Sequence, residues 1–176
     1  MGATDEYWVF GYGSLMWQPG FAFLEQAPAT VYGYHRAFCI YSHHYRGTAA
    51  RPGLVLGLDR GGSCHGVAFR VASEDWAQTH AYLRARELTN YVYLEADVRA
   101  HLAGRQVTAL TYVADRSHGQ YAGGLSLEEQ ARLITQGIGI SGACTDYALA
   151  TLQHLREAGI HDTRLEALGR SITKTA

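Results

Sequence analysis

Short apolar runs separated by glycine-containing turns fill the first two-thirds of the chain, and this pattern is typical of β-strands. Val67, Phe69 and Val71 alternate with other residues, as they do on the buried face of a strand. The same reading, with β-branched and aromatic content as the second criterion, predicts six strands. They cover Tyr7–Tyr12, Val31–Tyr41, Leu54–Asp59, Cys64–Val71, Tyr91–Val98 and Val107–Ala114.

Glycines also predict how these strands connect. Gly61 and Gly62 form a turn short enough to join the third and fourth strands as a hairpin. Gly33 lies inside the second strand and predicts a bulge there. Ala103 and Gly104 predict the turn between the last two strands.

Helical patterns interrupt the strands once and then complete the chain. Ser73 predicts the N-cap of a first helix that ends near Glu87. Ser126 and Glu129 have the spacing of a capping box, which predicts a helix to about Gln136. Two more helices are predicted, one over Tyr147–Glu157 and a short last one capped by Thr163 with Glu166.

Together these elements predict an α+β fold. A small sheet often closes on itself to remove its edges, so we expect a barrel-like mixed sheet of about six strands with packed helices. No linker, repeat or change in composition divides the chain, which predicts a single domain over residues 1–176. Residues 120–126 read as a loop and are the best candidate for a mobile flap.

Composition narrows the possible environments and partners. The 15 basic and 16 acidic residues nearly balance, and no basic stripe is present, so we expect no nucleic acid partner. Three widely separated cysteines favour neither a disulfide framework nor a cysteine zinc site, and they suit a reducing compartment. We find no signal peptide and no long apolar run, which predicts a cytoplasmic protein without a membrane partner.

The stretch Val9–Trp17, Val-Phe-Gly-Tyr-Gly-Ser-Leu-Met-Trp, is the best candidate for a binding site. Gly11 and Gly13 carry no Cβ, which allows a tight turn and a close approach to a ligand. The N–H groups of such a turn make a cradle for an anion or a developing oxyanion. The alternative is that both glycines mark a bulge in an edge strand, with Tyr12 and Trp17 as packing residues.

Several known glycine motifs do not fit this turn. Met16 stands where a dinucleotide-binding fingerprint needs its third glycine, and no lysine of a phosphate loop is near. A nucleophile elbow needs a glycine two residues before its serine, where this chain has Tyr12. Ser14 is therefore not placed as the nucleophile of an α/β-hydrolase.

Glu87 is the candidate general base. A carboxylate at a helix C-terminus is disfavoured by the macrodipole, and the neighbouring Leu88 is apolar, so the pKa of Glu87 is expected to be raised. The alternative is a solvated glutamate paired with Arg84 or Arg86. The adjacent His43 and His44 would point to opposite faces of a strand, so we expect no metal site.

A set of motifs, in order along nearly the whole chain, resembles the γ-glutamylcyclotransferases, and most closely their ChaC-like, glutathione-specific branch. The motif Tyr-Leu-x-x-Arg-Glu, present here as Tyr82–Glu87, carries the catalytic base in that family. The other matching segments are Val9–Trp17, Gly33–Arg36, Tyr45–Thr48, Arg51–Val55, Cys64–Arg70, Tyr121 with Gly123, and Gly139–Gly142 with Asp146 and Tyr147.

This resemblance implies an enzyme that converts glutathione into 5-oxoproline and cysteinylglycine without a cofactor or metal. Glu87 would be the catalytic base. The implied substrate-binding residues are Val9, Phe10, Gly11, Tyr12, Gly13, Ser14, Leu15, Arg46 and Tyr121. Two alternatives stay open: a cyclotransferase for other γ-glutamyl amino acids or γ-glutamylamines, and a non-catalytic γ-glutamyl-binding module.

The chain departs from the family pattern in two places. Ala143 and Cys144 stand where Pro-Asn is expected, and Gly124 and Leu125 replace a proline-rich stretch. The second change bears on the stiffness of the loop at residues 120–126 and on recognition of the substrate's Cys-Gly end.

Overall fold

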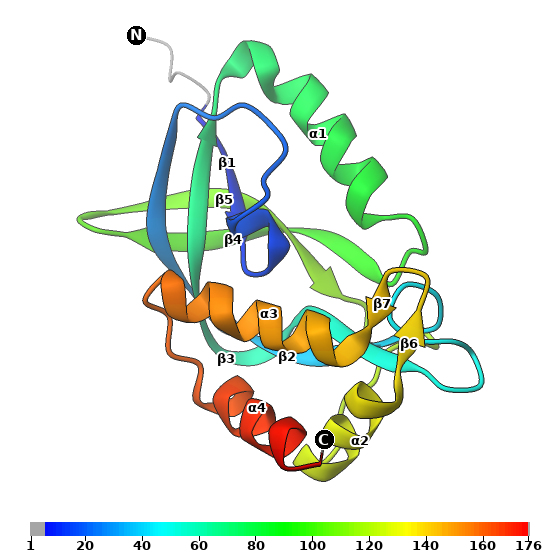
Figure 1. The fold of residues 1–176 in the computed structure, drawn as a ribbon. Helices are drawn as coiled ribbons and strands as arrows, with labels where there is room; N and C mark the ends of the chain where they lie inside the picture. Colours follow the sequence, from blue (N-terminus) through cyan, green and yellow to red (C-terminus); the bar gives the residue numbers. More distant parts are fainter. Residues whose placement is uncertain (1–5, 176) are drawn as a thin grey trace, which may run out of the picture. The chain divides into compact units, whose positions relative to one another are not determined.

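A closed five-stranded barrel of mixed pairing is the centre of the fold in the computed structural model, which describes residues 6–175. The strand order is β1-β3-β2-β4-β5 (Figure 1). Strand β1 pairs antiparallel with β3 and parallel with β5, so the sheet is mixed as predicted. The strands are β1 (Tyr7–Gly11), β2 (Glu25–Ser42), β3 (Gly53–Val71), β4 (Tyr93–Leu102) and β5 (Arg105–Ala114).

The α+β barrel-like fold is confirmed, but the predicted hairpin at Gly61 and Gly62 is wrong. The two strands predicted on either side of it are one strand, β3, and the barrel therefore has five strands. The glycines take φ values of +102° and +72° inside the strand, and His35 of β2 donates to the Gly61 carbonyl at 2.9 Å. Because β2 is long enough to accompany β3 on both sides, the glycine pair distorts the strand without reversing it. Gly33 in β2 also has a positive φ of +87°, the backbone conformation of a bulge glycine.

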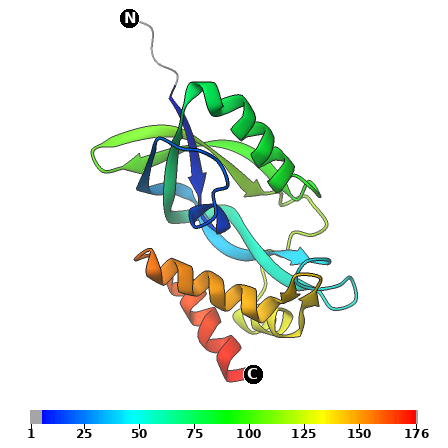
Figure 2. The same cartoon turned by 45° about the horizontal axis from the view of Figure 1, so that its top comes forward.

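Helix α1 (Ser73–Glu87) lies along the barrel strands β1 and β5 (Figures 1 and 2). Its N-cap is Ala72, which makes no side-chain cap, so the predicted cap at Ser73 is wrong by one residue. Leu83 of α1 packs into one buried cluster with Val9 of β1 and Tyr112 of β5. This cluster holds the end of α1 against the end of β1.

The C-terminal helices follow the predicted order with different limits. The capping box of Ser126 and Glu129 starts α2 (Leu127–Gln136), as predicted. Helix α3 (Cys144–Glu157) begins three residues earlier than expected. Helix α4 (Thr163–Thr175) is 13 residues long, and Asp162 caps it by accepting from Leu165 N, not Thr163. The short strands β6 (Ile138–Gly139) and β7 (Gly142–Ala143) precede α3.

The described residues form two compact units, and each unit joins two separate segments of the chain. The first contains residues 6–36 and 58–115, and the second contains residues 37–57 and 116–175. Strands β2 and β3 pass from one unit into the other. The prediction of a single domain is not tested by this division and stays a prediction.

Within the second unit, buried side chains of α3 and α4 form much of the interior.

All three cysteines of the chain are buried: Cys144 donates its thiol to the Leu54 carbonyl at 3.0 Å, while Cys39 and Cys64 are 3% and 2% exposed. The loop predicted as a flap is tied to β2, because Tyr41 N donates to Gln120 and Ala122 N donates to Cys39.

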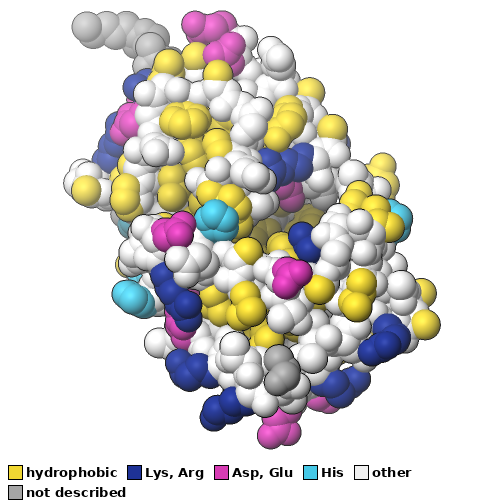
Figure 3. Space-filling model, in the orientation of Figure 1, with side chains coloured by type: hydrophobic (Ala, Val, Ile, Leu, Met, Phe, Trp, Pro, Cys, Tyr) yellow, Lys and Arg dark blue, Asp and Glu magenta, His cyan; other side chains and the backbone are white. Residues whose placement is uncertain are grey.

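Charges of both signs share the face of the molecule in Figure 3. That distribution fits the balanced composition, and the absence of a nucleic acid partner stays a prediction. No helix within residues 6–175 is long and apolar enough to cross a membrane.

Candidate active site

The glycine turn doubles back directly after β1. A Cβ on Gly11 would lie 3.1 Å from Leu15 Cβ and 3.3 Å from Met16 N, so the chain closes tightly on itself there. The short 3₁₀ helix η1 (Ser14–Met16) follows, and Met16 N donates to Gly13 O at 2.9 Å. Strand β1 pairs with β3 without interruption from Tyr7 to Gly11. The alternative of a bulge in β1 is therefore wrong.

The backbone carbonyls of this turn are held by donors from neighbouring elements. Thr111 Oγ1 of β5 donates to Phe10 O at 3.0 Å, and Arg36 Nε of β2 donates to Tyr12 O at 2.6 Å. Within residues 6–175, no hydrogen bond of the turn uses the N–H of Gly13, Ser14 or Leu15 as its donor. The turn thus holds its carbonyls against the barrel and leaves a group of donors for a ligand, which supports the interpretation as an anion cradle.

Some side chains of the turn are buried, and others are exposed to solvent. Val9 and Phe10 are fully buried and Leu15 is 5% exposed, so these side chains pack inside the fold, and the role of the three residues as substrate contacts stays a prediction. The hydroxyl of Tyr12 donates to Tyr112 O at 2.9 Å. Ser14 is exposed, and its hydroxyl accepts a hydrogen bond from Arg86 at 2.8 Å.

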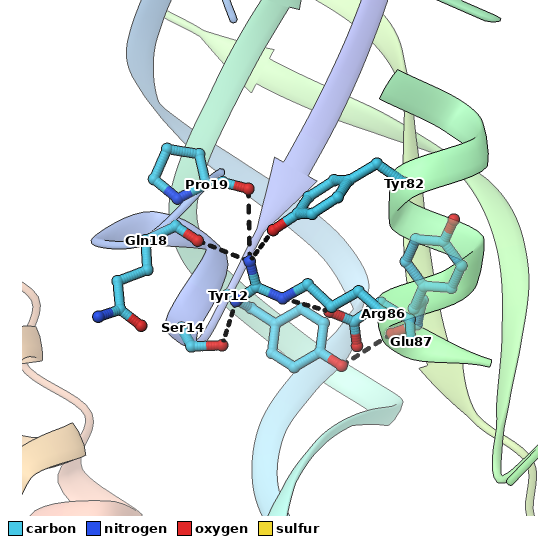
Figure 4. A network of polar contacts seen from close by, with 8 residues as sticks. Tyr12, Ser14, Gln18, Pro19, Tyr82, Arg86 and Glu87 are labelled. Atoms are coloured by element: carbon cyan, nitrogen blue, oxygen red, sulfur yellow. Dashed lines mark hydrogen bonds and ion pairs between the residues drawn. The ribbon is translucent and has the colours of Figure 1, made fainter. Parts of the chain in front are cut away.

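Arg86 joins the last turn of α1 to the glycine turn (Figure 4). Its Nη1 donates to Gln18 O at 2.7 Å and to the Tyr82 hydroxyl at 3.0 Å, while Nη2 donates to Ser14 Oγ. Its Nε lies 3.4 Å from Glu87 Oε1. A single guanidinium therefore contacts both candidate parts of the site, the turn and the carboxylate.

Glu87 is the last residue of α1, and its side chain is 19% exposed. Burial raises the pKa of its carboxyl, and the nearby charge of Arg86 only partly opposes this effect. Glu87 thus combines a feature of each interpretation. It forms the ion pair with Arg86, and its carboxyl still has a raised pKa. A carboxylate of this kind accepts a proton more readily than an ordinary glutamate.

Glu95 of β4 also contacts α1, but the pKa of its carboxyl is shifted in the opposite direction from that of Glu87. Burial alone would raise the pKa of its carboxyl, but hydrogen bonds from Tyr112 and His80 and the charge of Arg84 lower it. Arg84 thus pairs with Glu95 and not with Glu87. Burial and the hydrogen bond to Glu95 raise the pKa of Tyr112, so its hydroxyl stays protonated. Two carboxylates with opposite pKa shifts are typical of a site in which one group moves protons and the other stays charged.

The other two predicted site residues lie in the second unit, where each makes local contacts. Arg46 Nη1 donates to Ala143 O at 3.2 Å, and its guanidinium lies 5.4 Å from the centre of the Tyr147 ring. Tyr121 forms an isolated antiparallel bridge with Ile40. Their roles as substrate contacts stay predictions.

Two residues of the site were not predicted from the sequence. Arg86 is the arginine of the Tyr-Leu-x-x-Arg-Glu motif and a predicted ion-pair partner of Glu87, but nothing in its spacing indicates that it reaches Ser14. Arg36 is 2% exposed and bonds the turn from behind. Its signals in the sequence are its place in the matching segment Gly33–Arg36 and a charge within a mostly apolar and aromatic strand, and neither predicts the bond to Tyr12.

Sequence comparison relates this chain to known proteins. The profile of the ChaC-like protein family matches residues 7–175. A glutathione-specific γ-glutamylcyclotransferase of Escherichia coli is 37% identical over 168 residues, which cover 95% of this chain and 73% of that protein. One from Schizosaccharomyces pombe is 32% identical, covering 91% of this chain and 90% of the other.

A solved structure resembles the fold closely. The crystal structure of a yeast γ-glutamyl cyclotransferase specific to glutathione superposes with a TM-score of 0.85 at 23% sequence identity, covering 96% of each chain. At this identity the likeness bears on the fold, and the sequence matches bear on the family. The family profile spans almost the entire sequence, and it contains both the glycine turn and the Tyr82–Glu87 motif. This chain belongs to the ChaC-like protein family.

Proposed function

We propose that the chain is a glutathione-specific γ-glutamylcyclotransferase that releases 5-oxoproline and cysteinylglycine. The observation that carries this proposal is a half-buried carboxylate with a raised pKa, Glu87, which Arg86 links to a turn with free backbone donors. The activity named for the relatives from Escherichia coli and Schizosaccharomyces pombe supports it. We also propose a cytoplasmic location and a reaction that needs no cofactor.

Glu87 performs the proton transfers in the proposed reaction. The α-amine of the γ-glutamyl group is normally an ammonium, which has no lone pair for attack. Glu87 removes one proton, and the amine nitrogen then attacks the γ-carbonyl carbon to close a five-membered ring. The amide C–N bond to the cysteine nitrogen breaks, and protonated Glu87 returns its proton to that leaving nitrogen. The ring nitrogen gives up its second proton as the lactam forms, and the released amine takes up one proton to become an ammonium. The attack is intramolecular, so holding the chain folded supplies much of the rate.

The backbone donors of the turn bind negative charge in this scheme. The N–H groups of Gly13, Ser14 and Leu15 receive the oxyanion that forms on the γ-carbonyl, or the α-carboxylate of the substrate. Arg46 and Tyr121 complete the proposal, Arg46 as a cation for a carboxylate and Tyr121 as a cover over the bound substrate.

A product assay tests the proposed function. Purified protein without added cofactor should convert glutathione into 5-oxoproline and cysteinylglycine in equal amounts, measured by mass spectrometry. The same assay with γ-glutamyl-alanine and a γ-glutamylamine should give a kcat/KM lower by roughly tenfold or more. A preference for either of those compounds would change the substrate class. Binding of glutathione in a calorimeter without any product would instead favour the binding module.

Replacing Arg86 by Met should weaken catalysis and change its pH dependence. The variant loses the charged donors to Ser14 and Gln18, so we expect kcat/KM to fall by about 10- to 100-fold. Loss of the nearby positive charge also raises the pKa of Glu87 further, so the acidic limb of the pH profile should move to higher pH.

Arg84→Met is the matched control for this variant. Arg84 stands two residues earlier on α1, is 54% exposed and pairs with Glu95. Its replacement should leave the acidic limb of kcat/KM in place. The role given to Arg86 is wrong if both variants have the pH profile of the unmodified protein.

A further inference from the structure

We propose that Arg36 is a positioning residue that aims the Gly13 N–H at the substrate. The inference rests on the proposed function and goes beyond it, because Arg36 bonds the backbone of Tyr12 and is not among the residues proposed to contact the substrate. Its side chain comes from β2 and is 2% exposed, so it has no direct access to a ligand in solvent.

The Arg36 guanidinium binds two backbone carbonyls at once. Nε donates to Tyr12 O at 2.6 Å, and Nη2 donates to His65 O of β3 at 2.7 Å. The guanidinium is a rigid planar fork, so two bonds to two different elements fix its orientation. The carbonyl of Tyr12 is thereby held at a set direction relative to the barrel.

The direction of that carbonyl determines the direction of the next N–H. In a planar trans peptide the C=O of one residue and the N–H of the following residue point to opposite sides. The residues described contain no cis peptide bond. With Tyr12 O held by Arg36, Gly13 N–H must point away from Arg36. Gly13 has no side chain to restrict this peptide, so an outside contact is needed to fix it.

The positive charge of Arg36 also makes the Gly13 N–H a better donor. A charged donor polarises the carbonyl that it binds, and hydrogen bonds that share one peptide group strengthen each other in a buried site. Met16 N binds the Gly13 carbonyl in the next peptide, and Arg86 binds the Ser14 hydroxyl. The turn is therefore held on several sides, and Arg36 holds the carbonyl of the Tyr12–Gly13 peptide.

Kinetics of Arg36→Lys and Arg36→Met test this role. Lysine keeps the charge and offers one donor group for Tyr12 O, while methionine keeps only the aliphatic stem. We expect kcat/KM per folded molecule to fall by about 10-fold in Arg36→Lys and by about 100-fold or more in Arg36→Met, in line with the loss of one or more charged hydrogen bonds. Glutathione turnover would be measured beside circular dichroism and Tm.

Val98→Ala is the control for a loss of stability alone. Val98 is buried in β4 of the same unit, where it pairs with Ala109 of β5. This variant should lower Tm while kcat/KM per folded molecule stays unchanged. Partial recovery of kcat/KM by Arg36→Lys relative to Arg36→Met is a result that a purely structural role would not give. If Arg36→Met does not fold, the comparison of kcat/KM per folded molecule between Arg36→Lys and Val98→Ala decides whether Arg36 has a positioning role.

Calorimetry in a Glu87→Gln background then identifies the charge that Gly13 meets. If Arg36→Lys weakens glutathione binding by the same factor by which it lowers kcat/KM, the Gly13 N–H binds the α-carboxylate. Unchanged binding with a lower kcat assigns it to the oxyanion, and both results support positioning. An active protein in which Arg36→Lys behaves like Val98→Ala overturns this inference alone. A protein that does not turn over glutathione overturns the proposed function and this inference together.

Discussion

Glu87→Gln should lower the turnover of glutathione by about 10²- to 10⁴-fold, the usual contribution of a general base. The amide has nearly the same shape as the carboxylate but cannot accept the proton of the substrate ammonium. In the unmodified protein, kcat/KM should fall as the pH drops through the pKa of Glu87, which burial places above the ordinary value of 4.5. The acidic limb should be absent from whatever activity Glu87→Gln retains.

The same substitution should not weaken the fold at neutral pH. Burial disfavours the charged form of Glu87, so the folded protein binds its proton more tightly than the unfolded chain does. The stability that this group contributes is fully present below the unfolded pKa and is lost as the pH rises through the raised folded pKa. At pH 7 the unmodified protein has lost this contribution to its stability, whereas Glu87→Gln has no carboxyl group that can ionise.

We therefore expect the Tm of Glu87→Gln at pH 7 to equal or exceed that of the unmodified protein. The difference should shrink as the pH approaches the ordinary pKa of glutamate. Thermal unfolding from pH 4 to pH 8, followed by circular dichroism, measures it. Full activity in Glu87→Gln would remove Glu87 as the base, and a clear drop in Tm would show that its carboxylate stabilises the fold.

Gly66→Ala should damage the site through the backbone alone. A Cβ at Gly66 of β3 would lie 2.3 Å from Gly11 O and 2.8 Å from Phe10 Cζ. The Gly11 carbonyl belongs to the strand that leads into the turn and cannot move aside as a flexible side chain would. We expect a loss of stability of about 1–3 kcal/mol. Displacement of the turn by even 1 Å would lower kcat/KM by roughly 100-fold.

Gly119→Ala provides the comparison for Gly66→Ala. A Cβ at Gly119 would meet nothing within 4 Å, and the residue does not have a positive φ. Its replacement should change stability by less than about 0.5 kcal/mol and leave the kinetics unchanged. Urea unfolding and glutathione turnover would be measured for both variants. Equal activity in the two would show that catalysis tolerates a shift of the turn.

Local patterns predicted the elements of the site better than its connections. The tight turn follows from the two glycines next to an apolar strand, and the end of α1 at Glu87 follows from helical periodicity. The bonds of Arg86 to Ser14 and of Arg36 to Tyr12 join residues 72 and 24 positions apart. No local pattern encodes such contacts, because barrel closure and the packing of α1 bring these residues together.

The errors in the fold have the same origin. Gly61 and Gly62 satisfy the local requirements of a hairpin turn, but β2 continues beside them and supplies partners on both sides. Ser73 is a good cap residue by type, yet the helix starts one residue earlier than predicted, and its N-cap is the buried Ala72, which directly follows β3. In both places a tertiary neighbour outweighs a local preference.

The burial of every cysteine bears on how this protein tolerates its own proposed substrate. Oxidised glutathione exchanges with a protein thiol only when the protein's thiolate can reach the disulfide. Cys39, Cys64 and Cys144 lie inside the fold, and burial raises the pKa of the Cys144 thiol, with the hydrogen bond to Leu54 and the charge of Arg46 opposing it in part. The folded chain keeps its three thiols away from solvent, so we expect it to form mixed disulfides with oxidised glutathione only slowly.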